Sequence, residues 1–587
     1  MKRLSNHLWT WGLTLVFGLV VLLFWRYRYP HVLSYQEQFQ LFLFDGAYLR
    51  EALSLPGGVA RYVAEFLTQF YNALTVGAII LAMLYMLVQR LVWRLSCHLI
   101  PGKGSTSRSL LSGTPDYYYP LSFLPALSLW YTMGDESVLP AYVVSLIICL
   151  LAMLCCPRGR YAQIAYMVIS VPLVYWLAGP LVWVLALYVA VRVVLDRLSR
   201  AWEAVLLLIY TFNWIQLSVY YVNYPFESLV AGLFYYRYPQ TVTMMVVLTA
   251  LLCIMVPVVA CFLPQLREKT ARMALYAQVI VLAVCAGTLV PMGYDARKYE
   301  LIDYDYLVRL NNWDGIVRKA EMKNPDLPMS VSATNLALAM QGKLGERIFD
   351  FYQHGSNGLL PPFERNFTTA QLTGEIYFHI GLVNTAQRFA FETMECLPDY
   401  RKSARVVKRL VETNLVNGQY AVARKYIDML KKTIFYKKWA ERTERLLGNE
   451  AEINRHPQYG WLRKVRLPDD FLFSEKETDK ICGQLFLHNP QNKMAVQYLL
   501  MQPLLDRDIE RFMQYLQVVQ GKISYNPRAV QETVALAFAQ QRQQPPQGLI
   551  SPVVLQSFNS FSNVMREGGA QLEAFRHTAW YYLTKGN

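Results

Sequence analysis

The sequence contains few charged residues and none of the short motifs that mark common enzyme classes. Charged residues make up 17% of the 587 positions, against roughly 25% in soluble domains. No GxSxG, Walker or HExxH motif occurs, so an ATP-driven machine is not expected. The nine cysteines form no CxxC pair or Cys/His cluster, which argues against a zinc or redox site. The net charge of +15 is not gathered into a Lys/Arg block with interleaved aromatics, so nucleic acid is not an expected partner.

Long apolar runs fill the chain up to Gly293 and are absent after Tyr294. A membrane span needs ~20 apolar residues, so an all-α transmembrane domain with about nine spans is predicted for residues 1–293. The candidate spans are 8–25, 71–93, 119–133, 138–156, 163–178, 181–195, 203–222, 241–263 and 273–293. No cleavage site of small residues follows the first run, which is therefore interpreted as an uncleaved span.

The distribution of lysine and arginine predicts the orientation of these spans. With the N-terminus in the cytoplasm, fourteen basic residues of the membrane half fall on the cytoplasmic side and five fall outside. Cytoplasmic loops carry the excess of basic residues, so we expect a cytoplasmic N-terminus in the cytoplasmic (inner) membrane. Nine spans then place the C-terminal domain outside, in the periplasm of a bacterium, whereas an even number would place it in the cytoplasm.

The C-terminal half repeats a pattern that is typical of paired helices. Gly342, Gly381 and Gly418 each precede a large apolar residue, a small residue and an aromatic one turn later. These segments resemble tetratricopeptide-type helix pairs, whose period is ~34 residues. The prediction is an α-helical repeat domain over 294–450 and further helical hairpins over 451–541. A polar, Pro-rich linker and a C-terminal helical segment are expected over 542–587.

Two acidic residues in the first outer loop are candidates for chemistry. This loop spans 29–70, and an amphipathic helix over 35–54 is expected to carry Glu37 and Asp45. Eight residues of helix separate them by ~12 Å along the axis, so they could frame a site. The simpler interpretation is that both belong to the solvated face of an interfacial helix.

The other predicted outer loops supply three further candidates. Asp135 and Glu136 lie in a very short loop, and paired acids beside a membrane cavity suit a general base or a divalent cation. Arg237 lies among tyrosines and could bind a lipid phosphate. The simpler interpretations are the charge bias of outer loops for the acids and an interfacial anchor for Arg237.

The first 293 residues resemble the GT-C superfamily of membrane glycosyltransferases. The resemblance lies in a long first outer loop with an acid soon after the first span, two interface helices and an extracytoplasmic tail. In that superfamily an acid of this loop acts as the base, and the sugar donor is a polyprenyl-phosphate lipid. The resemblance implies Glu37, in place of the usual Asp, as catalytic residue with Asp45 second. From their positions in the outer loops, Asp135, Glu136 and Arg237 are expected to take part in substrate binding.

Three functions are compatible with these patterns. The first is a lipid-linked sugar transferase whose repeat domain binds the acceptor or a protein partner, with at most a divalent cation as cofactor. The second is a non-catalytic membrane-anchored scaffold for an envelope protein complex, since helical repeats commonly bind partners on a concave face. A transporter ranks last, because intramembrane charges and broken helices are few.

Overall fold

The computed structural model separates into two compact units. Unit 1 comprises Met1–Tyr299 together with the short stretches Pro398–Ser403 and Lys432–Phe435. Unit 2 comprises Glu300–Leu397, Ala404–Lys431 and Tyr436–Asn587. The structure describes residues 2–99, 117–231, 244–264, 266–364, 366–397, 401–467, 477–545, 548–567 and 570–585.

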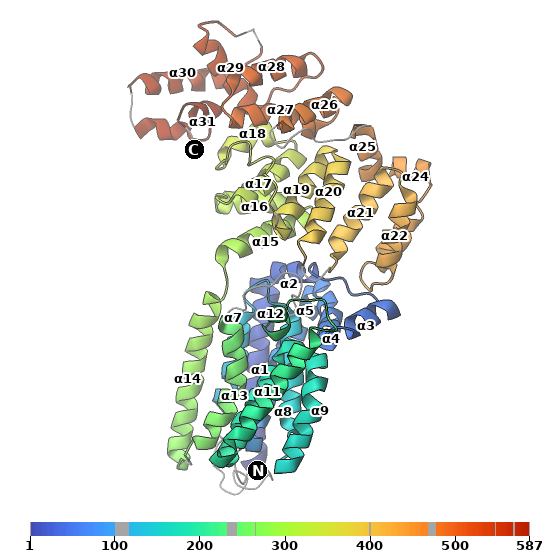
Figure 1. Cartoon of the computed structure of the whole chain (residues 1–587). Helices are drawn as coiled ribbons and strands as arrows, with labels where there is room; N and C mark the ends of the chain where they lie inside the picture. The colour runs from blue at the N-terminus through green and yellow to red at the C-terminus, as the bar shows by residue number, and fades with distance from the viewer. Residues whose placement is uncertain are drawn as a thin grey trace. The chain divides into compact units, whose positions relative to one another are not determined.

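Unit 1 is a bundle of helices that run side by side (Figure 1). Each of the nine predicted apolar segments coincides with a helix of this bundle. The helices are α1 (Lys2–Leu23), α5 (Leu74–Leu99), α7 (Leu124–Thr132), α8 (Pro140–Cys155), α9 (Arg160–Ala178), α10 (Val182–Asp196), α11 (Ala201–Ser218), α13 (Met244–Phe262) and α14 (Glu268–Met292).

Five stretches of unit 1 are long and apolar enough to cross a membrane, counted over the described residues only. They indicate a membrane protein, whereas the number nine and the orientation of the termini remain predictions. The five stretches are Leu8–Arg28, Leu74–Leu99, Arg160–Asp196, Met244–Phe262 and Glu268–Met292.

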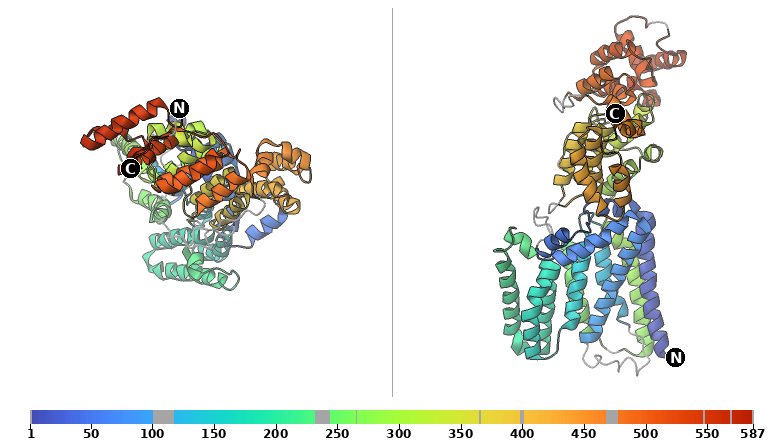
Figure 2. Two further views of the ribbon diagram at one scale, coloured as in Figure 1. Left: turned by 90° about the horizontal axis from the view of Figure 1, so that it is seen from above. Right: turned by 90° about the vertical axis from the view of Figure 1, so that its right-hand side faces the viewer.

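In the first outer loop two short helices replace the expected interfacial helix over 35–54, and a third lies where a second helix through Tyr62 and Phe66 was predicted. They are α2 (Pro30–Glu37), α3 (Gly46–Leu53) and α4 (Gly58–Thr68). The expectation of one continuous helix was wrong because the Asp45 side chain accepts a hydrogen bond from the backbone N–H of Ala47 and so begins a new helix. These helices and the N-terminus lie at opposite ends of the bundle (Figure 2). We name the two ends the first-loop end and the N-terminal end.

Unit 2 is built from helices joined by short turns, and its described residues contain an isolated β-bridge but no strand. Consecutive helices stack beside one another, as the two views of α19 to α22 show (Figures 1 and 2). The helices are α15 (Ala296–Arg309, which begins in unit 1), α16 (Trp313–Met322), α17 (Pro328–Met340), α18 (Leu344–Arg347), α19 (Phe367–Ile380), α20 (Val383–Glu395), α21 (Ala404–Val416), α22 (Tyr420–Lys431), α23 (Lys437–Glu444), α24 (Glu450–Arg455), α25 (Pro457–Val465), α26 (Thr478–His488), α27 (Lys493–Leu505), α28 (Ile509–Gln520), α29 (Arg528–Gln540), α30 (Pro552–Glu567) and α31 (Ala579–Lys585).

The three glycines of the sequence pattern lie in turns between helices, as predicted. Gly342, Gly381 and Gly418 have φ of +73°, +109° and +75°, values that residues with a Cβ rarely adopt. Gly381 ends α19 and lets α20 fold back against it, and Gly418 does the same for α21 and α22. Helical hairpins are therefore observed, while their assignment to the tetratricopeptide family remains a prediction.

A buried ionic network ties three helices of unit 2 together. Glu375 of α19 pairs with Arg405 at 3.3 Å and with Arg409 at 2.5 Å, both from α21. Arg405 also pairs with Asp305 of α15 at 2.9 Å. Burial alone would raise the pKa of Glu375, but the two guanidinium groups outweigh it and lower that pKa to about 2. His379 lies 3.9 Å from Glu375, and its pKa is lowered to about 4, chiefly by burial.

The lowered pKa of His379 predicts acid sensitivity. Because the folded protein holds this imidazole neutral, its contribution to stability is complete above the unfolded pKa of 6.5 and is lost as pH falls toward 4. We expect about 2 kcal/mol of this contribution to be lost between pH 7 and pH 5. In His379→Gln, the decrease in melting temperature between these pH values, followed by circular dichroism, should be smaller than in the wild type. His488→Gln, at an exposed position, should behave as the wild type, and an unchanged acid response in His379→Gln would contradict the assignment.

The turn glycines predict a graded loss of stability. A Cβ on Gly418 would meet open space, whereas one on Gly381 would lie 2.9 Å from Val465 Cγ2 at a φ of +109°. Gly418→Ala should cost roughly 1 kcal/mol for the left-handed backbone, and Gly381→Ala roughly 2–3 kcal/mol because steric overlap is added. Thermal melts of the two variants provide the comparison, and equal losses would mean that the Val465 contact relaxes freely.

Candidate functional site

A run of buried polar residues, here called the glutamine layer, lies at the C-terminal end of α2. It consists of Gln36, Glu37, Gln38 and Gln40, and Glu37, the last residue of α2, is only 3% exposed. Gln36 Nε2 donates a hydrogen bond to the carbonyl of Val138 at 3.4 Å. Gln36 Oε1 and Gln40 Nε2 have no hydrogen-bond partner among the described residues. Buried polar atoms without partners are uncommon and often mark the position of water or a ligand.

Asp45 is held by its own partners, apart from the helix that carries Glu37. Its Oδ1 accepts from the N–H of Ala47 at 3.2 Å, and its Oδ2 pairs with Lys432 at 2.6 Å within unit 1. The hydrogen bond from Lys432, followed by that from Ala47, lowers the pKa of Asp45. This carboxylate is therefore ionised and engaged at neutral pH.

Asp135 and Glu136 are neighbours in the sequence, but each binds a different residue. Asp135 Oδ1 accepts hydrogen bonds from the N–H and the hydroxyl of Ser137, at 2.9 and 2.6 Å. Glu136 pairs with Lys298 at 3.0 Å, and this hydrogen bond raises the pKa of Lys298. The loop is further fixed by Tyr299, whose hydroxyl donates to the carbonyl of Gly134 at 2.7 Å.

Two further predictions concern a lipid-phosphate ligand and a cation. Arg237 falls in the stretch 232–243, which lies outside the described residues. Among the residues that the structure describes, no group of three or more His, Cys, Asp or Glu could hold a metal ion. The role of Arg237 and the divalent cation therefore stay predictions.

An apolar groove of about 500 Å³ runs between α1, α7 and α14. Two of these helices, α1 and α14, belong to the stretches that are apolar enough to span a membrane. The groove therefore runs along the apolar stretches of both helices. Its lining includes Val16, Phe17, Val20, Phe24, Leu127, Trp130, Leu282, Ala286, Gly287, Val290 and Pro291.

An aromatic cluster connects the groove to α2. Phe24 lines the groove, and its ring centroid lies 5.0 Å from that of Trp130 and 5.4 Å from that of Tyr29. Tyr29 directly precedes α2 and stacks on Tyr294 at 5.2 Å with an interplanar angle of 12°. The groove thus ends beside the residue from which the helix carrying Glu37 begins. The sequence analysis missed this cluster, although the dense aromatic and arginine residues after the first span signal a membrane interface.

A buried carboxylate in α4 was not among the residues predicted from the sequence. Glu65 is 2% exposed, accepts a hydrogen bond from the Tyr48 hydroxyl, and pairs with Arg61 at 3.8 Å and with Arg401 at 3.5 Å, all within unit 1. Burial, then the charge of Glu65, raises the pKa of Tyr48 well above its ordinary range. The four-residue spacing of Arg61 and Glu65 could have suggested the first pair. The second joins positions more than 300 residues apart, which no local pattern predicts.

Comparison with known proteins gives a family without an assigned activity. No curated protein and no solved structure matches this chain. One family model, described as "Family of unknown function (DUF6057)", matches residues 6–586. Since the match covers nearly the whole sequence, both units are part of it, and the chain belongs to the DUF6057 family.

Proposed function

We propose that unit 1 is a GT-C-type transferase that uses a polyprenyl-phosphate-linked sugar on the extracytoplasmic face of the membrane. The observation that carries the proposal is the apolar groove between α1, α7 and α14, which ends at the aromatic cluster beside α2. A polyprenyl chain needs an apolar channel at acyl-chain depth and a polar reaction site at the interface. The groove and the glutamine layer match these two needs.

The interval between the end of the groove at Phe24 and the carboxylate of Glu37 suits a lipid-linked substrate. Phe24 marks the end of the groove, and Tyr29 starts the turn into α2. From Pro30 to Glu37 the helix rises roughly 10 Å. In the proposal, the phosphate and the sugar of the donor occupy this interval, with the chain in the groove and the sugar beside Glu37.

Glu37 is proposed as the general base. Its carboxylate takes the proton of an acceptor hydroxyl while the acceptor oxygen forms a bond to the anomeric carbon of the sugar. The bond between that carbon and the phosphate oxygen breaks, and polyprenyl phosphate leaves with the bonding electrons. The free amide atoms of Gln36 and Gln40 offer an acceptor and a donor for sugar hydroxyls.

The remaining predicted residues take supporting parts in this proposal. Asp45 is bound to Lys432, and Glu136 to Lys298. In this proposal Asp45, Asp135 and Glu136 shape the loops around the substrate. Acceptor or partner binding falls to the helical hairpins of unit 2.

The alternative is a non-catalytic, membrane-anchored scaffold with unit 2 as its binding part. The observation that favours it is that Asp45, Asp135 and Glu136 each have a structural partner. Under this alternative Glu37 is a structural residue and the groove holds bulk lipid. Transfer activity separates the two functions, because a scaffold has none.

Glu37→Gln should abolish transfer without loss of protein. Loss of a general base typically lowers kcat by roughly 10²–10⁴-fold, and the amide preserves the shape of the side chain. The assay follows labelled sugar moving from a panel of polyprenyl-phosphate donors to membrane acceptors. Asp45→Asn is the matched control and should stay within a few-fold of the wild type. Full activity in Glu37→Gln, or no transfer by the wild type across the panel, would favour the scaffold.

Filling the groove should weaken binding of the polyprenyl donor and leave the rate of the chemical step unchanged. Ala286→Trp places an indole in the groove, whereas Met273→Trp changes a lipid-facing position of the same helix that is 72% exposed. We expect Ala286→Trp to raise KM for the polyprenyl donor about tenfold or more, with kcat little changed and Met273→Trp close to wild type. Equal KM values for both variants would show that the polyprenyl chain of the donor binds outside this groove.

A further inference from the structure

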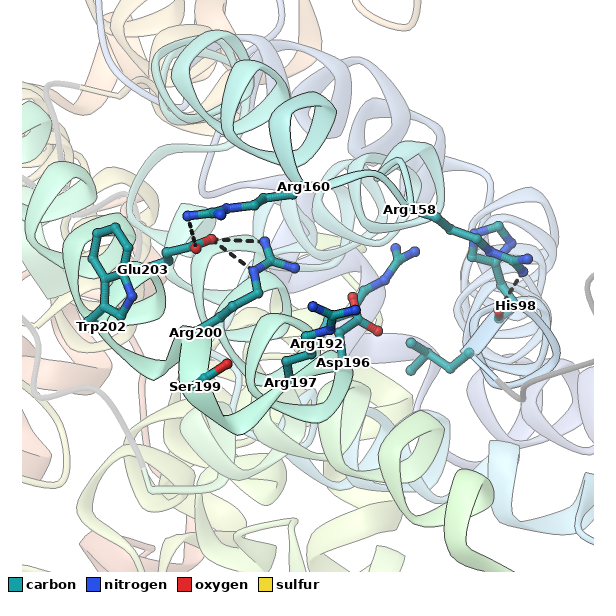
Figure 3. Close-up of a pocket in the computed structure, with 11 residues that line it drawn as sticks. His98, Arg158, Arg160, Arg192, Asp196, Arg197, Ser199, Arg200, Trp202 and Glu203 are labelled. Carbon is teal, nitrogen blue, oxygen red and sulfur yellow. Dashed lines mark hydrogen bonds and ion pairs between the residues drawn. The ribbon is translucent and has the colours of Figure 1, made fainter.

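The N-terminal end of unit 1 contains a second, chemically different pocket. Its volume is about 740 Å³, and it lies where α5, α9, α10 and α11 end or begin. Five arginines line it together with two acids and His98. In Figure 3 Glu203 lies between Arg160 and Arg200 on one side of the pocket, while Arg158 lies beside His98 on the other. The arginines are Arg158, Arg160, Arg192, Arg197 and Arg200.

The acids compensate only part of this positive charge. Glu203 is bound by Arg160 at 2.8 Å and by Arg200 at 2.9 Å. Arg158 and Arg192 donate to backbone carbonyls, those of His98 and Cys156, at 3.2 and 3.0 Å. Within the described residues no ion pair reaches Arg158, Arg192 or Arg197.

Arg192 makes this excess of charge costly. The residue is 6% exposed, and its hydrogen-bond partners, Cys156 and Tyr188, are neutral. A buried guanidinium with such partners loses hydration without gaining a counter-charge. An anion in the pocket would supply the missing charge. Guanidinium groups bind phosphate through paired N–H donors, and three of them from different turns can surround its tetrahedral oxygens.

The surroundings of the pocket favour a lipid as the source of that phosphate. Trp202 lines the pocket and is 57% exposed, and Tyr161 and Leu198 are 81% and 77% exposed. Aromatic residues of this kind gather at the headgroup level of membranes. Further along α11, Leu206 and Ile209 expose about half of their surface, which gives acyl chains an apolar path away from the pocket.

We propose that this arginine pocket binds the phosphate group of an anionic phospholipid, with Arg158, Arg192 and Arg197 as its ligands. With the predicted cytoplasmic N-terminus, the pocket faces the cytoplasmic leaflet, where basic pockets between membrane helices recognise such headgroups. A bound headgroup would join the turn between α8 and α9 to the turn between α10 and α11. The site is independent of the transfer reaction proposed for the opposite end.

The test uses the full-length protein and a double variant, Arg158→Gln/Arg197→Gln, which leaves the buried Arg192 in place. Native mass spectrometry measures how much phosphatidylglycerol and phosphatidylcholine each protein retains after release from mixed micelles. The wild type should retain phosphatidylglycerol at least tenfold more than phosphatidylcholine, and the double variant should lose most of this preference. Arg267→Gln/Lys269→Gln, which removes two exposed charges outside the pocket, should keep it.

A second arm separates lipid from soluble phosphate. Inorganic phosphate and sn-glycerol 3-phosphate are added at millimolar concentration, and retention of phosphatidylglycerol should not change. Displacement by either compound would overturn a lipid as the ligand. An unchanged lipid preference in the double variant, with circular dichroism confirming its fold, would overturn the pocket itself.

Discussion

Hydrocarbon offers no hydrogen-bond partner to a peptide group, so a chain that crosses it must satisfy its backbone within helices. Unit 1 follows from this constraint. Among the described residues, the connections between its long helices lie at the two ends of the bundle (Figure 2). Some of the polar side chains inside the bundle bind one another: Thr14 donates to Gln89 at 3.1 Å and contacts Tyr119 at 2.5 Å. The groove lies between helices of the bundle, while the glutamine layer and the arginine pocket lie at its two ends.

The two ends carry opposite chemistry. The first-loop end carries carboxylates and amides, and Asp45, Glu136 and Glu65 have lysine or arginine partners. At the N-terminal end, guanidinium groups outnumber the acids. Our two proposals follow this contrast, with proton transfer at the first-loop end and anion binding at the N-terminal end. The groove between α1, α7 and α14 ends at Phe24, whose ring lies 5.4 Å from that of Tyr29 beside α2.

Unit 2 obeys a different rule, because its helices lack long apolar stretches and bury one face against a neighbour. From α19 to α23 each helix packs mainly on the next, whereas α18 packs against α27 and α29. Turn glycines set where each helix reverses, and the ionic network of Glu375, Arg405 and Arg409 connects helices across the stack. Removing one partner of such a network leaves a buried charge uncompensated, so the network favours one register of the helices over others.

The sequence by itself determined the features that depend on neighbouring residues. Apolar runs located the nine helices of the bundle, and Gly342, Gly381 and Gly418 located turns of unit 2, because helix length and backbone freedom are local properties. The prediction of one helix over 35–54 was wrong because of a local detail: Asp45 caps the N-terminus of α3, so a new helix begins there. Tertiary structure alone decided which distant side chains meet, as with Asp45 and Lys432 or Glu65 and Arg401. It also brought arginines from separate turns into one pocket. Such pairs form only when whole helices pack, and the packing depends on shape and burial summed over the chain, which no short stretch of sequence contains.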